Sequence, residues 1–254
     1  MRMRLVALTL TALAALPAQV LAAPTASKAD TLVRMAFDNW RANSSVTEIT
    51  MVVHRPDWER SMTMKAWTVG DSDALVRFTA PAKDAGNATL KKADETWVFN
   101  PKLNQVIKLP ASMLAQSWMG SDFSYNDLSK ADDLLTKYTH KIVSEKVADG
   151  HKVYTIDAIP KPAAPVVWGK LQVVVRDDGV MLAETYFDQD MKVVRRMTTS
   201  KVAKIGGREY PASMTMKPAN EPGKWTKIET TSGQFDITIP RYLFTLSNLQ
   251  NPRD

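Results

Sequence analysis

The sequence has no cysteine, only ten glycines and only three histidines. Without cysteine there are no disulfide frameworks, thiol nucleophiles, iron–sulfur clusters or cysteine-ligated zinc, and the few glycines argue against a glycine-rich nucleotide-binding enzyme. His54, His140 and His151 fall at the ends of separate expected strands, without the spacing of a zinc site. No nucleophile-elbow, P-loop or dinucleotide-binding motif occurs. We therefore expect no enzymatic activity, no cofactor and no metal.

The composition is that of a globular protein, with 44% apolar and 24% charged residues in a chain of 254. That length allows one large all-β domain or two smaller domains. Thirteen methionines and seven tryptophans are many for this length. The net charge is +6, but the lysines and arginines are scattered rather than clustered. Scattered charge, together with the export signal described next, makes nucleic acid an unexpected partner.

The first residues have the pattern of a secretory signal. A basic start, Met1–Arg4, precedes an apolar run, Leu5–Leu16, and small residues follow up to Ala23. We expect cleavage after Ala22 or Ala23, which leaves residues 23–254 as the mature protein. A membrane anchor is the alternative, but the run is short for a bilayer and ends at a proline. No cysteine stands at the cleavage site, so we expect no lipid anchor.

Most of the remaining sequence alternates with period two, as strands do. One amphipathic helix is expected first, over residues 28–42, beginning at Ser27 with Asp30 in a capping-box arrangement. About a dozen strands follow without βαβ alternation, which predicts one mainly β domain with a large antiparallel sheet, curled or nearly closed. The clearest strand ranges are 88–92, 96–100, 105–109, 138–147, 151–159, 166–176, 181–188, 192–203, 208–217 and 225–237.

A segment of helical character separates the two groups of strands. Residues 110–120 have the spacing of a short apolar helix, and Ser124 with Asp127 and Ser129 with Asp132 suit two further helix starts. The segment is too apolar for a solvated loop, so we expect it to cover the mouth or concave face of the sheet as a lid. The expected lid residues are Met113, Leu114, Trp118, Met119, Phe123 and Tyr125. For its aspartates we expect capping and solvated loop roles.

Alternating apolar residues of the strands are candidates for the lining of an inner cavity. Methionine is flexible and polarizable, so a methionine-rich surface adapts to ligands of different shape. The alternative is an ordinary core under the N-terminal helix. The candidates are Ile49, Met51, Val53, Met62, Met64, Trp97, Phe99, Met197, Met214 and Met216.

Four stretches resemble the LolA-like family of outer-membrane lipoprotein-sorting proteins. They are Asp94-Glu95-Thr96-Trp97-Val98-Phe99-Asn100-Pro101, Val106-Ile107-Lys108-Leu109-Pro110, Met119-Gly120-Ser121-Asp122-Phe123-Ser124-Tyr125-Asn126-Asp127-Leu128 and Tyr242-Leu243-Phe244-Thr245-Leu246-Ser247-Asn248-Leu249. The resemblance covers essentially the whole mature chain, and the third stretch is the most specific.

The resemblance implies an incomplete antiparallel β-barrel of about 11–13 strands, wrapped over helices, with an apolar cavity for acyl chains. It also implies a periplasmic carrier of a lipoprotein or lipid, which receives cargo from an inner-membrane transporter and delivers it to an outer-membrane acceptor. We expect it to act as a monomer. The basic residue that holds the lid in such carriers has no match at Val69-Gly70-Asp71, and Arg77 is the nearest candidate. The third stretch is typical of a branch that accompanies hydrophobe exporters, so the cargo can be a lipid.

Two other functions stay open on the sequence. One is an envelope interaction or sensor module that uses the same fold, as an accessory to a hydrophobe exporter. The other, weaker alternative is a hydrolase built around Asp122 or a histidine.

Overall fold

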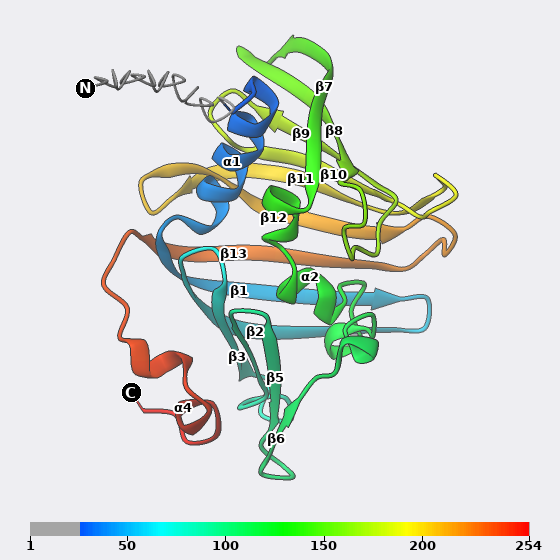
Figure 1. Cartoon of the computed structure of the whole chain (residues 1–254). Helices are drawn as coiled ribbons and strands as arrows, with labels where there is room; N and C mark the ends of the chain where they lie inside the picture. Colours follow the sequence, from blue (N-terminus) through cyan, green and yellow to red (C-terminus); the bar gives the residue numbers. More distant parts are fainter. Residues whose placement is uncertain (1–25, 254) are drawn as a thin grey trace, which may run out of the picture.

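Thirteen strands form one antiparallel sheet in the computed structural model, which describes residues 26–253 (Figure 1). The strand order is β6-β5-β4-β3-β2-β1-β13-β12-β11-β10-β9-β8-β7, and the two edge strands do not pair with each other, so the sheet is not closed. This confirms the predicted mainly β fold with an incomplete barrel of 11–13 strands. The signal peptide predicted for residues 1–22 lies outside the described residues.

The strands follow the predicted order along the chain, with hairpin turns between sequence neighbours except where β6 leads to β7. Their bounds are β1 (Ser44–Arg55), β2 (Trp58–Val69), β3 (Asp73–Ala80), β4 (Ala88–Lys92), β5 (Glu95–Asn100), β6 (Gln105–Lys108), β7 (Tyr138–Ala148), β8 (His151–Pro160), β9 (Lys170–Arg176), β10 (Met181–Phe187), β11 (Val193–Ile205), β12 (Arg208–Pro218) and β13 (Trp225–Phe235).

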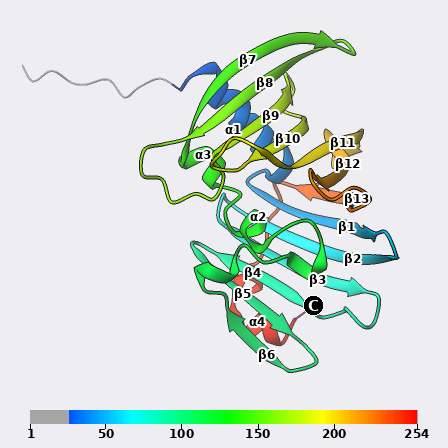
Figure 2. The same cartoon turned by 90° about the vertical axis from the view of Figure 1, so that its right-hand side faces the viewer.

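Helix α1 (Lys28–Arg41) covers the concave face of the half-sheet formed by β7–β12 (Figures 1 and 2). It begins at the predicted capping box, in which the backbone N–H of Asp30 donates to the Ser27 hydroxyl and the N–H of Ser27 donates to the Asp30 carboxylate. Its buried face includes Leu32 and Val33, which pack in one cluster with strand residues such as Val173. The helix therefore forms one wall of the space inside the curved sheet.

Residues 109–137, here called the insert, run from edge strand β6 to edge strand β7 across the concave side (Figure 2). The predicted helix at 110–120 is instead two 3₁₀ turns, η1 (Ala111–Met113) and η2 (Trp118–Gly120). Two short helices follow, α2 (Tyr125–Ser129) and α3 (Asp133–Thr136).

Only one of the two helix starts predicted inside the insert is correct. Ser124 and Asp127 form a capping box at α2, as expected. Ser129 does not cap α3, because its hydroxyl is buried and accepts a hydrogen bond from the Thr96 hydroxyl at 2.8 Å. The contact joins the insert to β5.

The C-terminal turns η3 (Arg241–Phe244) and α4 (Leu246–Gln250) cover the opposite face of the sheet, over β3–β5. Arg77 on β3 donates to the carbonyls of Asn248 at 2.9 Å and Leu249 at 3.0 Å. The candidate from sequence for holding the lid therefore fastens the C-terminal segment instead. Within residues 26–253, no helix is long and apolar enough to cross a membrane.

Candidate functional site

The concave side of the sheet encloses a cavity of about 450 Å³ between the strands, α1 and the insert. Strand residues that share this face form its floor, since directly paired residues point to the same side of a sheet. The floor residues are mostly apolar or small: Thr47, Ile49, Met64, Ala66, Val76, Thr89, Met197, Met214 and Ile228. A volume of this size lies in the range of about 300–1,000 Å³ that is typical of small-ligand sites.

Helix α1 and the β8–β9 loop add to the cavity wall. Phe37 and Trp40 line it from α1, and residues 165–168 line it from the β8–β9 loop. The strand predicted at 166–176 begins only at Lys170, and Val166 and Trp168 in the loop before it pack against the core under α1. Three successive apolar residues at 166–168 were the available signal that this loop turns inward.

Four of the ten candidate lining residues line the cavity, namely Ile49, Met64, Met197 and Met214. Met51, Val53 and Met62 lie in a cluster covered by the insert, where Trp118 packs on them. Met216 is fully buried in the core under α1. These four residues belong to ordinary core, the alternative that the sequence left open.

Trp97 and Phe99 lie on the opposite face of the sheet from the cavity, and the expectation that they line it is wrong. Trp97 pairs directly with Leu90, which is in the cluster covered by the C-terminal residues Phe244 and Leu249. The alternation along β5 groups these two aromatic residues correctly on one face. It carries no information on which face is concave, because a second apolar layer covers the convex face here.

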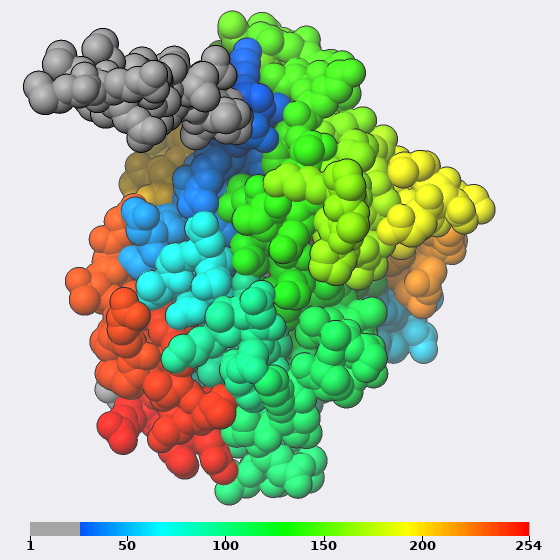
Figure 3. Space-filling model, viewed as in Figure 1, coloured from blue at the N-terminus to red at the C-terminus, as the bar shows by residue number. Residues whose placement is uncertain are grey.

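The insert lies across the cavity, and in Figure 3 its green atoms occupy the centre of the face shown. Of the six expected lid residues, Leu114, Trp118 and Phe123 line the cavity. Met119 and Tyr125 pack instead on the cluster around Met51 and Met62, and Met113 is half-buried outside the lining.

Trp118 is the most enclosed aromatic residue of the insert. Its indole N–H donates to the Thr89 hydroxyl at 3.1 Å, and its ring centre lies 5.3 Å from that of Phe78. Both partners belong to the sheet, so this side chain fastens the insert to β3 and β4. A hydrogen bond and an aromatic contact together fix the indole in one position.

Three aspartates of the insert pair with basic residues on three different strands. Asp122 pairs with Arg55 of β1 at 3.1 Å, and Asp127 pairs with Arg195 of β11. The third pair joins Asp132 to Lys91 of β4 at 2.5 Å. We call these contacts the insert ion pairs.

The insert ion pairs are largely shielded from solvent, which corrects the expectation of solvated loop aspartates. The Asp122 and Asp127 side chains are only 6% and 11% exposed. Burial lowers the pKa of Arg195, but the nearby Asp127 and Tyr186 raise it more, and the net direction is upward. Arg55 also donates to the Gly120 carbonyl at 2.9 Å. Together these contacts hold the insert from both halves of the sheet.

Glu184 on β10 also lines the cavity, and this carboxyl group has no ion-pair partner among residues 26–253. The Tyr186 hydroxyl donates to it at 2.8 Å, and both side chains line the cavity. Burial raises the pKa of Glu184 to about 7, and the charge of Asp127 adds to the rise, whereas the Tyr186 hydrogen bond and Arg195 oppose it. Burial also raises the pKa of Tyr186. These two side chains form a polar spot beside the mostly apolar floor of the cavity.

Two histidines serve as local structural contacts. The His54 ring stacks on Trp225 with a centre distance of 4.7 Å. His140 lies 2.7 Å from the Asp30 carboxylate and donates to the Leu134 carbonyl at 2.9 Å, so it joins α1, β7 and α3.

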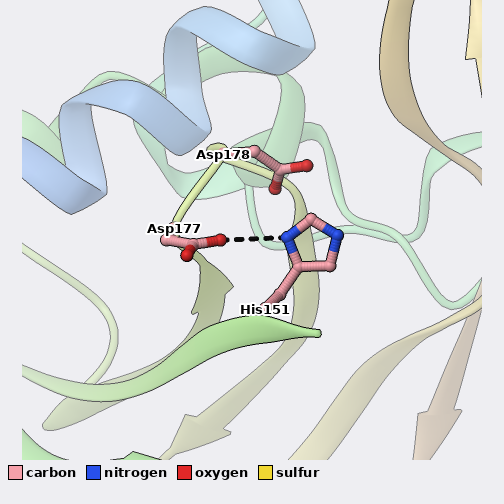
Figure 4. Close-up of side chains that lie close together, drawn as sticks. All are labelled: His151, Asp177 and Asp178. Carbon is pink, nitrogen blue, oxygen red and sulfur yellow. Dashed lines mark hydrogen bonds and ion pairs between the residues drawn. The ribbon is translucent and has the colours of Figure 1, made fainter. Parts of the chain in front are cut away.

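The third histidine, His151, lies with Asp177 and Asp178 in the one group of described residues whose geometry could hold a metal ion (Figure 4). The His151 ring lies 3.0 Å from Asp177, which also accepts the backbone N–H of Lys152 at 3.1 Å. Asp178 is paired with Arg176. These contacts are sufficient to explain the group as the corner where the β7–β8 turn meets the β9–β10 turn.

Comparisons with known proteins were made by family model, by sequence and by structure. A family model described as "Uncharacterized protein" matches residues 70–251, which is more than half of the chain. No curated protein sequence matches. Among solved structures, a DUF1329 family protein from Desulfovibrio piger is 25% identical with a TM-score of 0.76, over 87% of this chain and 96% of that one.

Two further structures share the fold at lower identity. A putative outer membrane lipoprotein-sorting protein domain from Vibrio parahaemolyticus is 20% identical with a TM-score of 0.75, over 88% of this chain and 98% of that one. A LolA superfamily protein from Nitrosomonas europaea is 19% identical with a TM-score of 0.71, over 87% and 98% of the two chains. These likenesses confirm the LolA-like fold.

Proposed function

Because the chain belongs to the family of uncharacterized proteins whose model matches residues 70–251 and has the LolA-like fold, we propose that it is a periplasmic carrier of acyl chains. The cargo is a lipid or the acylated end of a lipoprotein, taken from an inner-membrane transporter and given to an outer-membrane acceptor. The observation that carries the proposal is the apolar cavity of about 450 Å³ beneath the insert.

The lining of the cavity suits a ligand that is bound through burial rather than through specific polar contacts. Each methylene transferred from water into such a site contributes about 0.8 kcal/mol. The unbranched side chains of Met64, Met197 and Met214 adapt to the shape of a flexible chain. A single chain fits the present volume, and a cargo with several chains requires the insert to move outward.

The insert is the element that can move, because it is joined to the sheet by side chains rather than by strand pairing. The three insert ion pairs and Trp118 hold it closed. We infer that cargo enters when these contacts open, with Trp118 and Phe123 as the gate. If Trp118→Ala and Phe123→Ala leave the binding of a fluorescent fatty acid unchanged, the assignment of these two residues as the gate is wrong.

Filling the cavity tests the proposal directly. Ala66 lines the cavity from β2, and the neighbouring Lys65 points to the other face of the same strand. Ala66→Trp should weaken binding of a fluorescent fatty acid by about tenfold or more, since excluding only two methylenes costs about 1.6 kcal/mol. Lys65→Trp is the matched control and should bind as the wild type does. Equal binding by both variants would place the ligand elsewhere.

Native mass spectrometry of gently purified protein gives an independent test. Co-purified lipid supports the carrier, and its mass begins to identify the cargo. The same spectrum tests the expectation of a monomer.

The second candidate, a module that docks another envelope protein, is favoured by one feature. The free edge strand β7 exposes Val143 and Val147, at 48% and 72%. Exposed apolar side chains beside an unpaired strand suit addition of a strand from a partner. In that case Val147→Lys should abolish a stable complex with the partner, and the purified protein should hold no lipid.

A further inference from the structure

Two of the basic residues in the cavity lining, Lys91 and Lys130, each pair with an aspartate. Arg41 is held through Nε and Nη2 by the backbone carbonyls of Gly70 and Asp73, and it has no carboxylate partner among residues 26–253.

Glu184 presents one half of its carboxyl group to the cavity. Oε2 accepts the Tyr186 hydroxyl at 2.8 Å, whereas Oε1 has no hydrogen-bond partner among residues 26–253. The side chain lines the cavity, and its strand partners on either side are Val173 and Met197. Oε1 is not one of the fully enclosed unpaired atoms of residues 26–253, so it is open to the cavity. A ligand that displaces water from this oxygen binds best when it donates a hydrogen bond to it, because an acceptor left unpaired on burial is costly.

We propose that Glu184 is a polar subsite of the cavity and selects cargo whose head group donates a hydrogen bond, as a hydroxyl does. This rests on the proposed carrier function and specifies its cargo. A carboxylate or phosphate head is disfavoured at this subsite by repulsion from the Glu184 carboxylate.

The test is competition at pH 8 between ligands with one chain length and different heads. The purified protein is loaded with the neutral fluorescent probe N-phenyl-1-naphthylamine, which is displaced by dodecanol or by dodecyl methyl ether. The ether accepts but cannot donate a hydrogen bond. Dodecanol should bind about tenfold more tightly than the ether, the worth of one hydrogen bond to a charged group.

Two variants separate a binding role of Glu184 from a structural one. Glu184→Gln keeps an acceptor oxygen and should keep the preference for dodecanol over the ether. Glu184→Leu should bring the ratio of the two affinities to about one while probe binding persists. The ratio is measured within each variant, so a general loss of stability does not change it.

The outcomes distinguish failure of this inference from failure of the carrier. If the ether binds as tightly as dodecanol to the wild type, or if Glu184→Leu leaves the ratio unchanged, the subsite is overturned while the carrier stands. If neither the probe nor either ligand binds, the carrier itself is overturned, and the subsite with it.

Discussion

Replacing Glu184 by glutamine should change how the stability of the protein depends on pH. Burial raises the pKa of this carboxyl from 4.5 to about 7 in the folded protein. Between these values the folded state therefore binds a proton that the unfolded state has released, and the free energy of unfolding falls as pH rises. The contribution of the group is fully present below pH 4.5 and is lost above about pH 7.

The size of the effect follows from the pKa difference. A rise of 2.5 units corresponds to about 3 kcal/mol at about 1.4 kcal/mol per unit. Glu184→Gln is neutral at every pH and has the same shape, so its stability relative to the wild type should increase by about 3 kcal/mol between pH 4 and pH 8. Comparing the two proteins at each pH cancels the titration of the groups that they share.

Urea unfolding followed by tryptophan fluorescence at pH 4, 5, 6, 7 and 8 measures this difference. Glu229→Gln is the control, because its carboxylate pairs with Lys227 on the surface and such pairs contribute about 0–1 kcal/mol. A difference for Glu184→Gln that stays constant with pH would refute the argument from burial. A difference of opposite sign would mean that Arg195 dominates and keeps the carboxyl ionised.

Three further changes test the contacts of the insert and of the C-terminal segment. Arg195→Ala leaves the shielded Asp127 unpaired, so unfolding should become easier by about 3–5 kcal/mol and limited proteolysis should cut within residues 109–137. Arg77→Ala should leave the insert protected and expose the C-terminal segment to proteolysis, as mass spectrometry of the fragments will show. Trp118→Ala should lower stability by about 3–5 kcal/mol in urea unfolding, and a loss below 1 kcal/mol would contradict its role in fastening the insert.

The sheet could be predicted from the sequence because each strand shows its own period-two pattern and each turn its own residues. The strands at 88–92 and 96–100 match β4 and β5 within a residue. These signals are local in the sequence. They predict the sheet correctly because strands that are neighbours in the chain are also neighbours in the sheet. The capping boxes at Ser27 and Ser124 were visible for the same reason.

The side of the sheet that faces the cavity could not be predicted, because alternation is symmetric between the two faces. Trp97 and Phe99 form one row on β5, and Thr96 and Val98, one polar and one apolar residue, form the row on the other face. An alternating pattern shows which face of a strand is buried only when the other face is polar. Here the C-terminal turns cover the convex face, so both faces carry apolar residues and the assignment fails.

The insert ion pairs could not be predicted from the sequence, because the acidic and basic residues that form them are far apart in the chain. Asp122 and Asp127 lie 67 and 68 residues from Arg55 and Arg195, in opposite directions along the chain. Only the order of the open sheet brings β1 and β11 to the same concave side. Since the insert joins the two unpaired edge strands, it must cross that side, and its acidic residues meet basic residues from both halves. The open edge that prevents closure of the barrel is therefore also what places a removable cover over the cavity.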